Sequence, residues 1–240
     1  VEEVFSNLGI EKKVPNLPSV FIGSFELSPY QAIQAYQTIA DDGFYTPLRS
    51  IRQIRETSGE IEFSYPYSVE QRMRPEPITL LKFALQQTFL TGTARGFSKK
   101  DRDKWNAGGK TGTSDDQRDS WFVGFAGDLL VLVWLGFDDN RPTVLTGRTG
   151  AFQVWKNFIN DINPVPTEKT KLQRIQYVWT DIDDGLLSGK SCRNSLLVPF
   201  IQGTEPIKVP NVRKKCFTKN PSNNGAKIDK IKKIFEGGQG

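Results

Sequence analysis

The sequence predicts an α+β fold in which helices pack on an antiparallel β-sheet. Two segments, 28–43 and 78–92, repeat apolar residues at the spacing of an amphipathic helix. Two runs rich in aromatic and β-branched residues flank Gly127-Asp128, which is typical of adjacent antiparallel strands. A polar stretch begins at Asn163, so we expect a small appendage beyond the sheet domain.

The segment 28–43 carries signals for both ends of a helix. Ser28 is a typical N-cap, Pro29 suits the first turn, and Gln31 completes a capping box. Gly43 follows the last apolar residues and marks the end. The predicted apolar face consists of Ile33, Tyr36, Ile39 and Ala40.

Three further segments show helical spacing. Residues 1–8 have it without a capping residue in front, as in a helix that is entered midway. Residues 78–92 follow the proline-broken run RPEP, and a last helix follows Gly150. The apolar positions are Ile78, Leu81, Leu85 and Phe89 in the former, and Ala151, Val154, Phe158 and Ile159 in the latter.

Alternating segments predict the strands. Residues 48–65 place Ser58-Gly59 between two short alternating runs, which predicts a β-hairpin. Residues 120–137 provide two antiparallel strands around a Gly-Asp turn. The run GGKTGT at 108–113 is then the strand that precedes them.

Length and composition limit the number and size of the domains that the chain can form. A chain of 240 residues with 37% hydrophobic content can bury the core of one large domain. The net charge is +5 and the pI is about 9.1. Much of the excess lies after Lys208, which favours a solvated basic tail over nucleic-acid binding. We expect one domain at 1–162, followed at 163–240 by a linker and a small, basic, irregular extension that ends in AKIDKIKKIF.

Histidine is absent, which excludes Ser-His-Asp and Cys-His nucleophiles and every His-ligated metal. Asp115, Asp116 and Asp119 alternate with other polar residues, which favours a solvated loop over a metal site. We therefore expect no metal and no cofactor. Three tryptophans have a spacing that favours core packing over a glycan-binding platform: Trp121, Trp134 and Trp155.

The two cysteines, Cys192 and Cys216, lie in one polar stretch without the close Cys or His neighbours of a zinc site. This favours a disulfide, with two separate free thiols as the alternative. A disulfide would persist in an oxidising compartment such as a periplasm and would stabilise the fold by about 3 to 4 kcal/mol in the chain-entropy model.

The run GGKTGTS at 108–114 is central to function and admits two interpretations. A phosphate-binding loop requires a glycine where Lys104 stands, and a helix afterwards. Here the glycine is missing and a strand follows. The sequence therefore favours a strand beside a binding site over a nucleotide loop.

Such a strand shows alternate side chains on each face. Lys110 and Gly112 should lie on one face, and Thr111 and Thr113 on the other, unless local twist re-aims them. Gly112 has no Cβ, so a ligand can lie against the backbone there. Hydroxyls and an ammonium beside an open strand suit a carboxylate, at about 1.5–3 kcal/mol for each charge-assisted hydrogen bond.

K-T-G is part of the signature of penicillin-binding proteins and class A β-lactamases. Around it stand LSPYQAIQAYQTIADDGFYTPLRSI, LTGTARG, AGGKTGTSDDQRDSWFVGF and WLGFDDNRPTVLTGRTGA. These blocks resemble the C-terminal part of the transpeptidase domain of class A, bifunctional penicillin-binding proteins, especially the 1b branch of proteobacteria. The resemblance covers residues 1–162; the stretch from DGLLSGKSC to Cys216 is weakly similar to the C-terminal extension of that branch.

The resemblance implies a DD-peptidase or β-lactamase-like transpeptidase fold, here incomplete, and a peptidoglycan DD-transpeptidase activity. It assigns the hydroxyls of Thr111 and Thr113 to the terminal carboxylate of the donor stem peptide, next to the bare backbone of Gly112. Lys110 would supply positive potential and help to set protonation at the second motif. The backbone N–H of Thr113 would be an oxyanion-hole donor.

The sequence departs from the family pattern, because no serine is followed at the third position by lysine. The nucleophilic S-x-x-K is absent, and Ser222-Asn223-Asn224 is the only S-x-N, on the wrong side of KTGT. We expect a longer enzyme whose anchor, glycosyltransferase domain and first two motifs lie upstream of Val1, so that this chain alone is inactive. The alternative is a non-catalytic module that binds cell-wall polymer or a partner protein.

The resemblance also implies a location and partners. The location is the periplasmic side of the inner membrane of a Gram-negative bacterium, reached through an upstream anchor. The ligands are stem peptides that end in D-Ala-D-Ala, β-lactams and, through the longer protein, a lipid-linked glycan precursor. A second copy of the protein and a regulatory lipoprotein are candidate partners, and nucleic acid is not expected.

Overall fold

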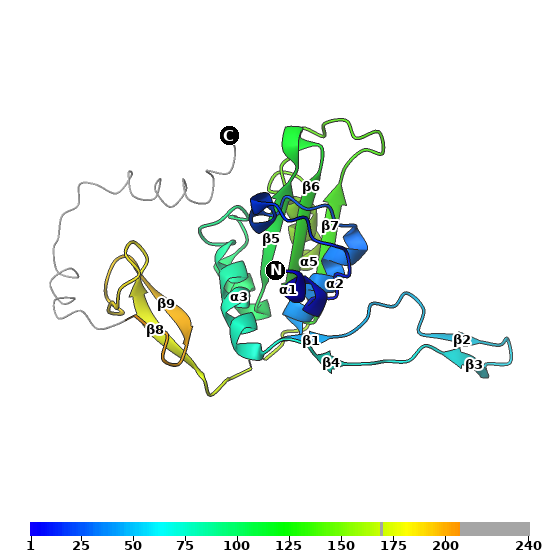
Figure 1. The fold of residues 1–240 in the computed structure, drawn as a ribbon, viewed down its shortest axis with the longest axis horizontal. Helices are drawn as coiled ribbons and strands as arrows, with labels where there is room; N and C mark the ends of the chain where they lie inside the picture. The colour runs from blue at the N-terminus through cyan, green and yellow to red at the C-terminus, as the bar shows by residue number, and fades with distance from the viewer. Residues whose placement is uncertain (169, 207–240) are drawn as a thin grey trace. The chain divides into compact units, whose positions relative to one another are not determined.

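A computed structural model describes residues 1–168 and 170–206 of the chain (Figure 1). The chain divides into two compact units, Val1–Lys169 and Thr170–Gly240. The predicted domain end at residue 162 is the end of the last helix of the first unit, whereas the division between the two units follows Lys169. No helix in the described ranges is both long and apolar enough to cross a membrane.

A three-stranded antiparallel sheet forms the centre of the first unit. It consists of β5 (Gly108–Thr113), β6 (Ser120–Ala126) and β7 (Leu129–Leu135), in the order β5-β6-β7. Gly127 turns the chain between β6 and β7 with a φ of 57°. The predicted α+β class and the three predicted strands are confirmed.

Helices cover both faces of this sheet (Figure 1). The helices α2 (Pro29–Ala40) and α3 (Pro75–Gln87) pack on one face, and α5 (Ala151–Ile162) packs on the other. Alternate residues of β6 serve the two cores, since Phe125 packs on the α2 side and Phe122 on the α5 side. The α5-side core holds Phe89, Phe97, Trp105, Phe122, Phe152, Trp155 and Ile159, and the α2-side core holds Ile39, Ile78, Leu85 and Phe125.

The start of α2 follows the predicted capping box. The Ser28 N–H donates to Gln31 Oε1 at 3.0 Å, and the Gln31 N–H donates to Ser28 Oγ at 3.2 Å. This exchange satisfies two N–H groups that the first turn of a helix leaves without a partner.

Two predicted helix faces are partly wrong. In α3, Ile78 and Leu85 are buried but Leu81 is exposed. In α5, Val154 and Phe158 are exposed, and the buried residues are Ala151, Phe152, Trp155 and Ile159. Both helices carry apolar residues on more than one side, so periodicity alone does not identify the side that meets the sheet.

The other helical segments of the first unit are short. They are α1 (Glu2–Asn7), the 3₁₀ turns η1 (Pro18–Ile22) and η2 (Asp115–Gln117), and α4 (Lys99–Trp105). The sequence did not predict α4, although Ser98 caps it by accepting the Asp101 N–H at 3.4 Å. Trp105 at its end is buried in the α5-side core.

A long two-stranded arm leaves the first unit between α2 and α3 (Figure 1). At its base β1 (Phe44–Tyr45) pairs with β4 (Glu70–Gln71), and at its tip β2 (Gln53–Arg55) pairs with β3 (Ile61–Ser64). The predicted hairpin is therefore confirmed. Every residue of β2 and β3 is exposed.

The second unit contains a hairpin that the sequence did not predict. Its strands are β8 (Ile175–Asp181) and β9 (Ser195–Ile201), antiparallel and paired over their full length. The expectation of an irregular module at 163–240 is therefore wrong for these two strands. Cys216 and the run AKIDKIKKIF lie outside the described residues, so the disulfide between Cys192 and Cys216 stays a prediction.

Candidate functional site

The predicted strand at 108–113 is β5, and it lies at one edge of the three-stranded sheet. Each of its six residues pairs with one residue of β6, without a register shift. Among the described residues, no strand pairs with the other edge of β5. The four residues of the KTGT run therefore lie on a regular strand with one open edge.

The two faces of β5 differ in chemistry. Cross-strand partners share a face, so Lys110 lies with Val123 and Gly112 with Trp121 on the α2 side. Thr111 and Thr113 lie on the α5 side, opposite Phe122 and Ser120. This is the alternation that the sequence predicts.

Backbone groups of β5 also point to the open edge. In an antiparallel ladder, residues alternate between pairs that exchange hydrogen bonds and pairs that do not. Ser114 donates its N–H to Asp119 O at 3.2 Å, so the preceding pair, Thr113 with Ser120, is of the second kind. The N–H and C=O of Thr113 and, two residues back, of Thr111 therefore face away from β6.

The segment after β7 holds the hydroxyl of Thr113. The Gly147 N–H donates to Thr113 Oγ1 at 2.9 Å. A side chain at Gly147 would not fit, because a Cβ there would lie 2.6 Å from Gly112 O and 2.7 Å from Trp121 O. Since Thr113 Oγ1 accepts this bond, its own O–H stays available to donate.

Ser120 holds the same segment from inside the sheet. This fully buried serine donates its Oγ–H to Thr146 O at 2.8 Å and accepts the Ala151 N–H at 2.9 Å. The first N–H of α5 and the loop beside Thr113 are thereby tied to β6. The position of Gly147 is thus set by the sheet itself.

The turn after α3 contacts the other half of β5. Thr88 Oγ1 lies 2.8 Å from both Gly109 O and Leu85 O, so these two carbonyls share its one proton. The hydroxyl oxygens of Thr93 and Thr111 lie 2.5 Å apart. Thr111 is thus hydrogen-bonded to a second hydroxyl that lies outside the KTGT run.

Lys110 carries the positive charge of the strand. Its Nζ donates to Thr111 O at 2.9 Å, which keeps the ammonium beside the open edge. Lys110 is exposed, but the protein around its ammonium partly desolvates it, which disfavours the charged form and lowers the pKa of Lys110 below the ordinary lysine value. An anion bound beside this ammonium would favour the charged form again.

The edge therefore combines hydroxyl donors, an ammonium and outward N–H groups. These are the groups that bind a carboxylate and stabilise an oxyanion. In the described residues, no group of three or more His, Cys, Asp or Glu side chains could hold a metal ion.

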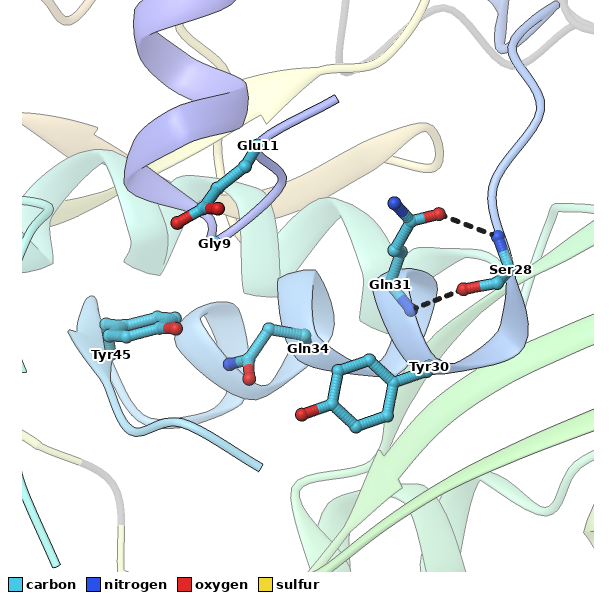
Figure 2. Close-up of a pocket in the computed structure, with 7 residues that line it drawn as sticks. All are labelled: Gly9, Glu11, Ser28, Tyr30, Gln31, Gln34 and Tyr45. Carbon is cyan, nitrogen blue, oxygen red and sulfur yellow. Dashed lines mark hydrogen bonds between the residues drawn. The ribbon is translucent and has the colours of Figure 1, made fainter. Parts of the chain in front are cut away.

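A hollow of about 530 Å³ lies elsewhere, where α2 meets the chain on either side of it (Figure 2). None of its described lining residues belongs to β5; they are Gly9, Glu11, Ser28, Tyr30, Gln31, Gln34 and Tyr45. The Gln34 amide is already used, since it donates to Thr46 O and accepts the Leu48 N–H. Ser28 and Gln31, which also line the hollow, are used in the capping box of α2.

Sequence reasoning missed four residues that hold the strand in place. They come from the turn after α3, from β6 and from the loop before α5: Thr88, Thr93, Ser120 and Gly147. The LTGTARG and LTGRTGA blocks contain two of them, Thr93 and Gly147, but no local pattern predicts contacts with β5. Among the predicted core tryptophans, Trp155 is fully buried, whereas Trp134 is 39% exposed and was wrongly assigned to the core.

Comparison with known proteins identifies the protein family to which this chain is similar. The family model described as "Penicillin binding protein transpeptidase domain" matches residues 11–139. Penicillin-binding protein 1B of Haemophilus influenzae is 39% identical over 151 residues, which are 63% of this chain and 19% of that protein. Penicillin-binding protein 1B of Vibrio cholerae is 36% identical over 160 residues, or 66% of this chain and 20% of that protein. The chain thus spans about a fifth of the length of these relatives.

A solved structure supports the fold. The crystal structure of penicillin-binding protein 1A from Haemophilus influenzae matches with a TM-score of 0.72 and 21% identity. The match covers 85% of this chain and 36% of that one. At this identity the likeness concerns the fold, which is an incomplete form of the longer protein's domain.

Proposed function

The chain belongs to the family of penicillin-binding protein transpeptidase domains, and from this premise we propose that it is the part of a peptidoglycan DD-transpeptidase that binds the donor carboxylate. The observation that carries this proposal is the open edge of β5. It presents the Lys110 ammonium, the hydroxyls of Thr111 and Thr113 and the outward N–H of Thr113 along one strand.

The donor is a stem peptide that ends in D-Ala-D-Ala. Its terminal carboxylate accepts hydrogen bonds from the Thr111 and Thr113 hydroxyls, with Lys110 nearby to balance the charge. Gly112 leaves space for the peptide to lie along the strand. The scissile carbonyl then lies beside the N–H of Thr113, which stabilises the negative charge that develops on its oxygen.

The reaction proceeds by two acyl transfers. A serine Oγ attacks the penultimate D-Ala carbonyl, the D-Ala–D-Ala amide bond breaks, and the released D-Ala amine takes a proton. An amine of a second stem peptide then attacks the ester, which forms the cross-link and returns the serine. We propose that the serine and its lysine belong to a region upstream of Val1, because this sequence contains no S-x-x-K. This chain with that region is called the full-length protein below.

The same family membership supports proposals about the setting. We place the protein on the periplasmic side of the inner membrane of a Gram-negative bacterium, held by an upstream anchor. A glycosyltransferase domain of the full-length protein would use the lipid-linked glycan precursor. A second copy and a regulatory lipoprotein are the proposed protein partners. The predicted disulfide between Cys192 and Cys216 would persist in this compartment.

Labelling with a fluorescent penicillin tests the proposal. We expect a stoichiometric covalent adduct on the full-length protein and none on this chain alone, both measured by intact mass. Thr113→Val in the full-length protein should slow labelling roughly tenfold or more, because one charge-assisted hydrogen bond is lost. Lys110→Ala should slow it as well. An adduct on this chain alone, or normal labelling rates in both variants, would contradict the assignment.

A further inference from the structure

We infer that Thr93 is a positioning residue for the carboxylate site, which acts by directing the hydroxyl proton of Thr111 toward the bound carboxylate. This inference rests on the proposed function and adds a residue from outside the KTGT run. It starts from the contact between the two hydroxyl oxygens, one on β5 and one on the turn that follows α3.

A threonine hydroxyl has one proton and can accept two hydrogen bonds. One proton lies between Thr93 and Thr111, and the other is free to bond elsewhere. A carboxylate is the stronger acceptor, so with an anion bound the Thr111 O–H points to the carboxylate and Thr93 donates to Thr111. The result is a chain of donors that runs from Thr93 to Thr111 to the ligand. Each bond in such a chain polarises the next and strengthens it.

The second threonine of the site shows the same arrangement. Thr113 Oγ1 accepts the N–H of Gly147, a donor that cannot reverse its direction. The proton of Thr113 is thereby left for the ligand. With an anion bound, Thr93 gives Thr111 what Gly147 gives Thr113, namely a donor from a neighbouring segment.

The turn that carries Thr93 is held rigidly enough for this role. Ala94 is fully buried in the α5-side core, and its N–H donates to Thr88 O at 3.2 Å. The hydroxyl of Thr88 in turn lies within hydrogen-bonding distance of Gly109 O on β5. The backbone on the C-terminal side of Thr93 is therefore fixed to the same strand that carries Thr111.

The exposure of Thr93 separates this role from packing. Its side chain is exposed, whereas those of its neighbours Ala94 and Phe97 are buried. Replacing its hydroxyl by a methyl group therefore removes a donor and leaves the core unchanged. Thr91, two residues earlier in the same turn, is also exposed, and its hydroxyl lies 3.5 Å from Gln87 O, within its own helix end. Thr91 is the matched control.

The test measures acylation of the full-length protein by benzylpenicillin and by its methyl ester. The two ligands differ in the carboxylate that Thr111 is proposed to bind. In Thr93→Val we expect the second-order acylation rate constant for the acid to fall about fivefold to tenfold, the effect of one lost hydrogen bond. The rate constant for the ester should change less than about twofold. Thr93→Ser should restore the rate with the acid, and Thr91→Val should leave both rates unchanged.

Other outcomes overturn the inference. If Thr93→Val slows the acid and the ester equally, or lowers the melting temperature of the free protein by as much as a core substitution, Thr93 has a structural role only. If it leaves both rates unchanged, Thr93 has no role in the site, while acylation of the wild-type protein still supports the proposed function. If benzylpenicillin fails to acylate the wild-type full-length protein, the proposed function fails and this inference fails with it.

Discussion

Two of the antiparallel strand pairs in the first unit, β5-β6 and β2-β3, have completely different surroundings. The pair β5-β6 lies between α5 on one face and α2 with α3 on the other, and Phe122 at its centre is 0% exposed. The pair β2-β3 lies at the tip of the arm, where Phe63 is 48% exposed and every other residue of the pair is exposed as well. An isolated two-stranded hairpin is marginally stable in water.

The regularity of the pairing also differs between these two strand pairs. The β5-β6 pairing runs without interruption from Gly108 to Thr113, whereas the β2-β3 pairing shifts between Ile54 and Arg55. Burial of alternate residues fixes a register, because a slip by one residue would expose the core side chains. Strand pairing alone therefore does not fix the positions of the Thr111 and Thr113 hydroxyls. The hydrophobic cores on both faces of the sheet fix the register of β5 and, with it, these positions.

The largest expected effect is a difference in the free energy of unfolding between a substitution in β5-β6 and one in β2-β3. Phe122→Ala should lower the free energy of unfolding by about 3–5 kcal/mol, because it opens a cavity among Phe89, Phe152 and Trp155. Phe63→Ala should cost less than about 1 kcal/mol, since it removes mainly one edge contact with Tyr65. Urea unfolding of the full-length protein, followed by tryptophan fluorescence, measures both. Equal losses would break the comparison.

The next effect concerns two glycines. Gly147→Ala places a methyl group against Gly112 O and Trp121 O, so the loop must move and its bond to Thr113 must break. We expect benzylpenicillin acylation to slow roughly 30-fold, because a small displacement of a binding group is costly. Gly59→Ala strains the turn of the arm, where φ is 93°, but should leave acylation unchanged. A slower rate in Gly59→Ala would show that the arm supports the site.

A smaller effect is expected from two serines. Ser120→Ala leaves Thr146 O and the Ala151 N–H without their buried partner, which should cost about 1–2 kcal/mol of stability. Ser64→Ala on the exposed strand β3 should change stability by less than about 0.5 kcal/mol. Thermal unfolding of the two variants measures the difference. A loss in Ser64→Ala as large as that in Ser120→Ala would contradict the contrast.

The smallest effect is a change in pH dependence. Because partial desolvation lowers the pKa of Lys110, its ammonium should lose its proton below the ordinary lysine pKa of 10.5. Acylation by an anionic β-lactam should therefore fall, on the order of a few-fold, as the pH rises through that lowered pKa. Lys110→Arg should remove the fall, since arginine keeps its charge.

The lowered pKa of Lys110 has the opposite effect on folding stability, which rises with pH where acylation falls. Between the lowered pKa and 10.5 the unfolded chain binds more protons at Lys110 than the folded one, so folding stability rises with pH in this window. Arg55→Lys on the exposed strand β2 is the control and should add no alkaline fall in acylation. An unchanged pH profile in Lys110→Arg would remove Lys110 from the account.

The sequence predicted those parts of the fold that local chemistry determines. The capping box at Ser28 and Gln31 requires only neighbours three residues apart, and the alternation along β5 follows from strand geometry. The helix α4 was missed because it is short and its N-cap, Ser98, is followed by six charged residues without an apolar pattern. The strands β8 and β9 were missed because the polar residues around them suggested an irregular segment.

The candidate site was predicted only in part, for a physical reason. The KTGT run can be recognised because its four residues are consecutive. The donors that hold it are far away in the sequence: Thr93 is 18 residues from Thr111, and Gly147 is 34 residues from Thr113. These contacts depend on packing between segments, which one sequence without its fold does not specify.

The measurement that tests the account most directly is a crystal structure of the full-length protein acylated by benzylpenicillin. The account predicts that the carboxylate lies within hydrogen-bonding distance, about 2.6–3.0 Å, of the hydroxyl oxygens of Thr111 and Thr113. It also predicts that the contacts of these hydroxyls with Thr93 and Gly147 persist. A carboxylate bound away from β5, with both hydroxyls left to their present partners, would contradict it.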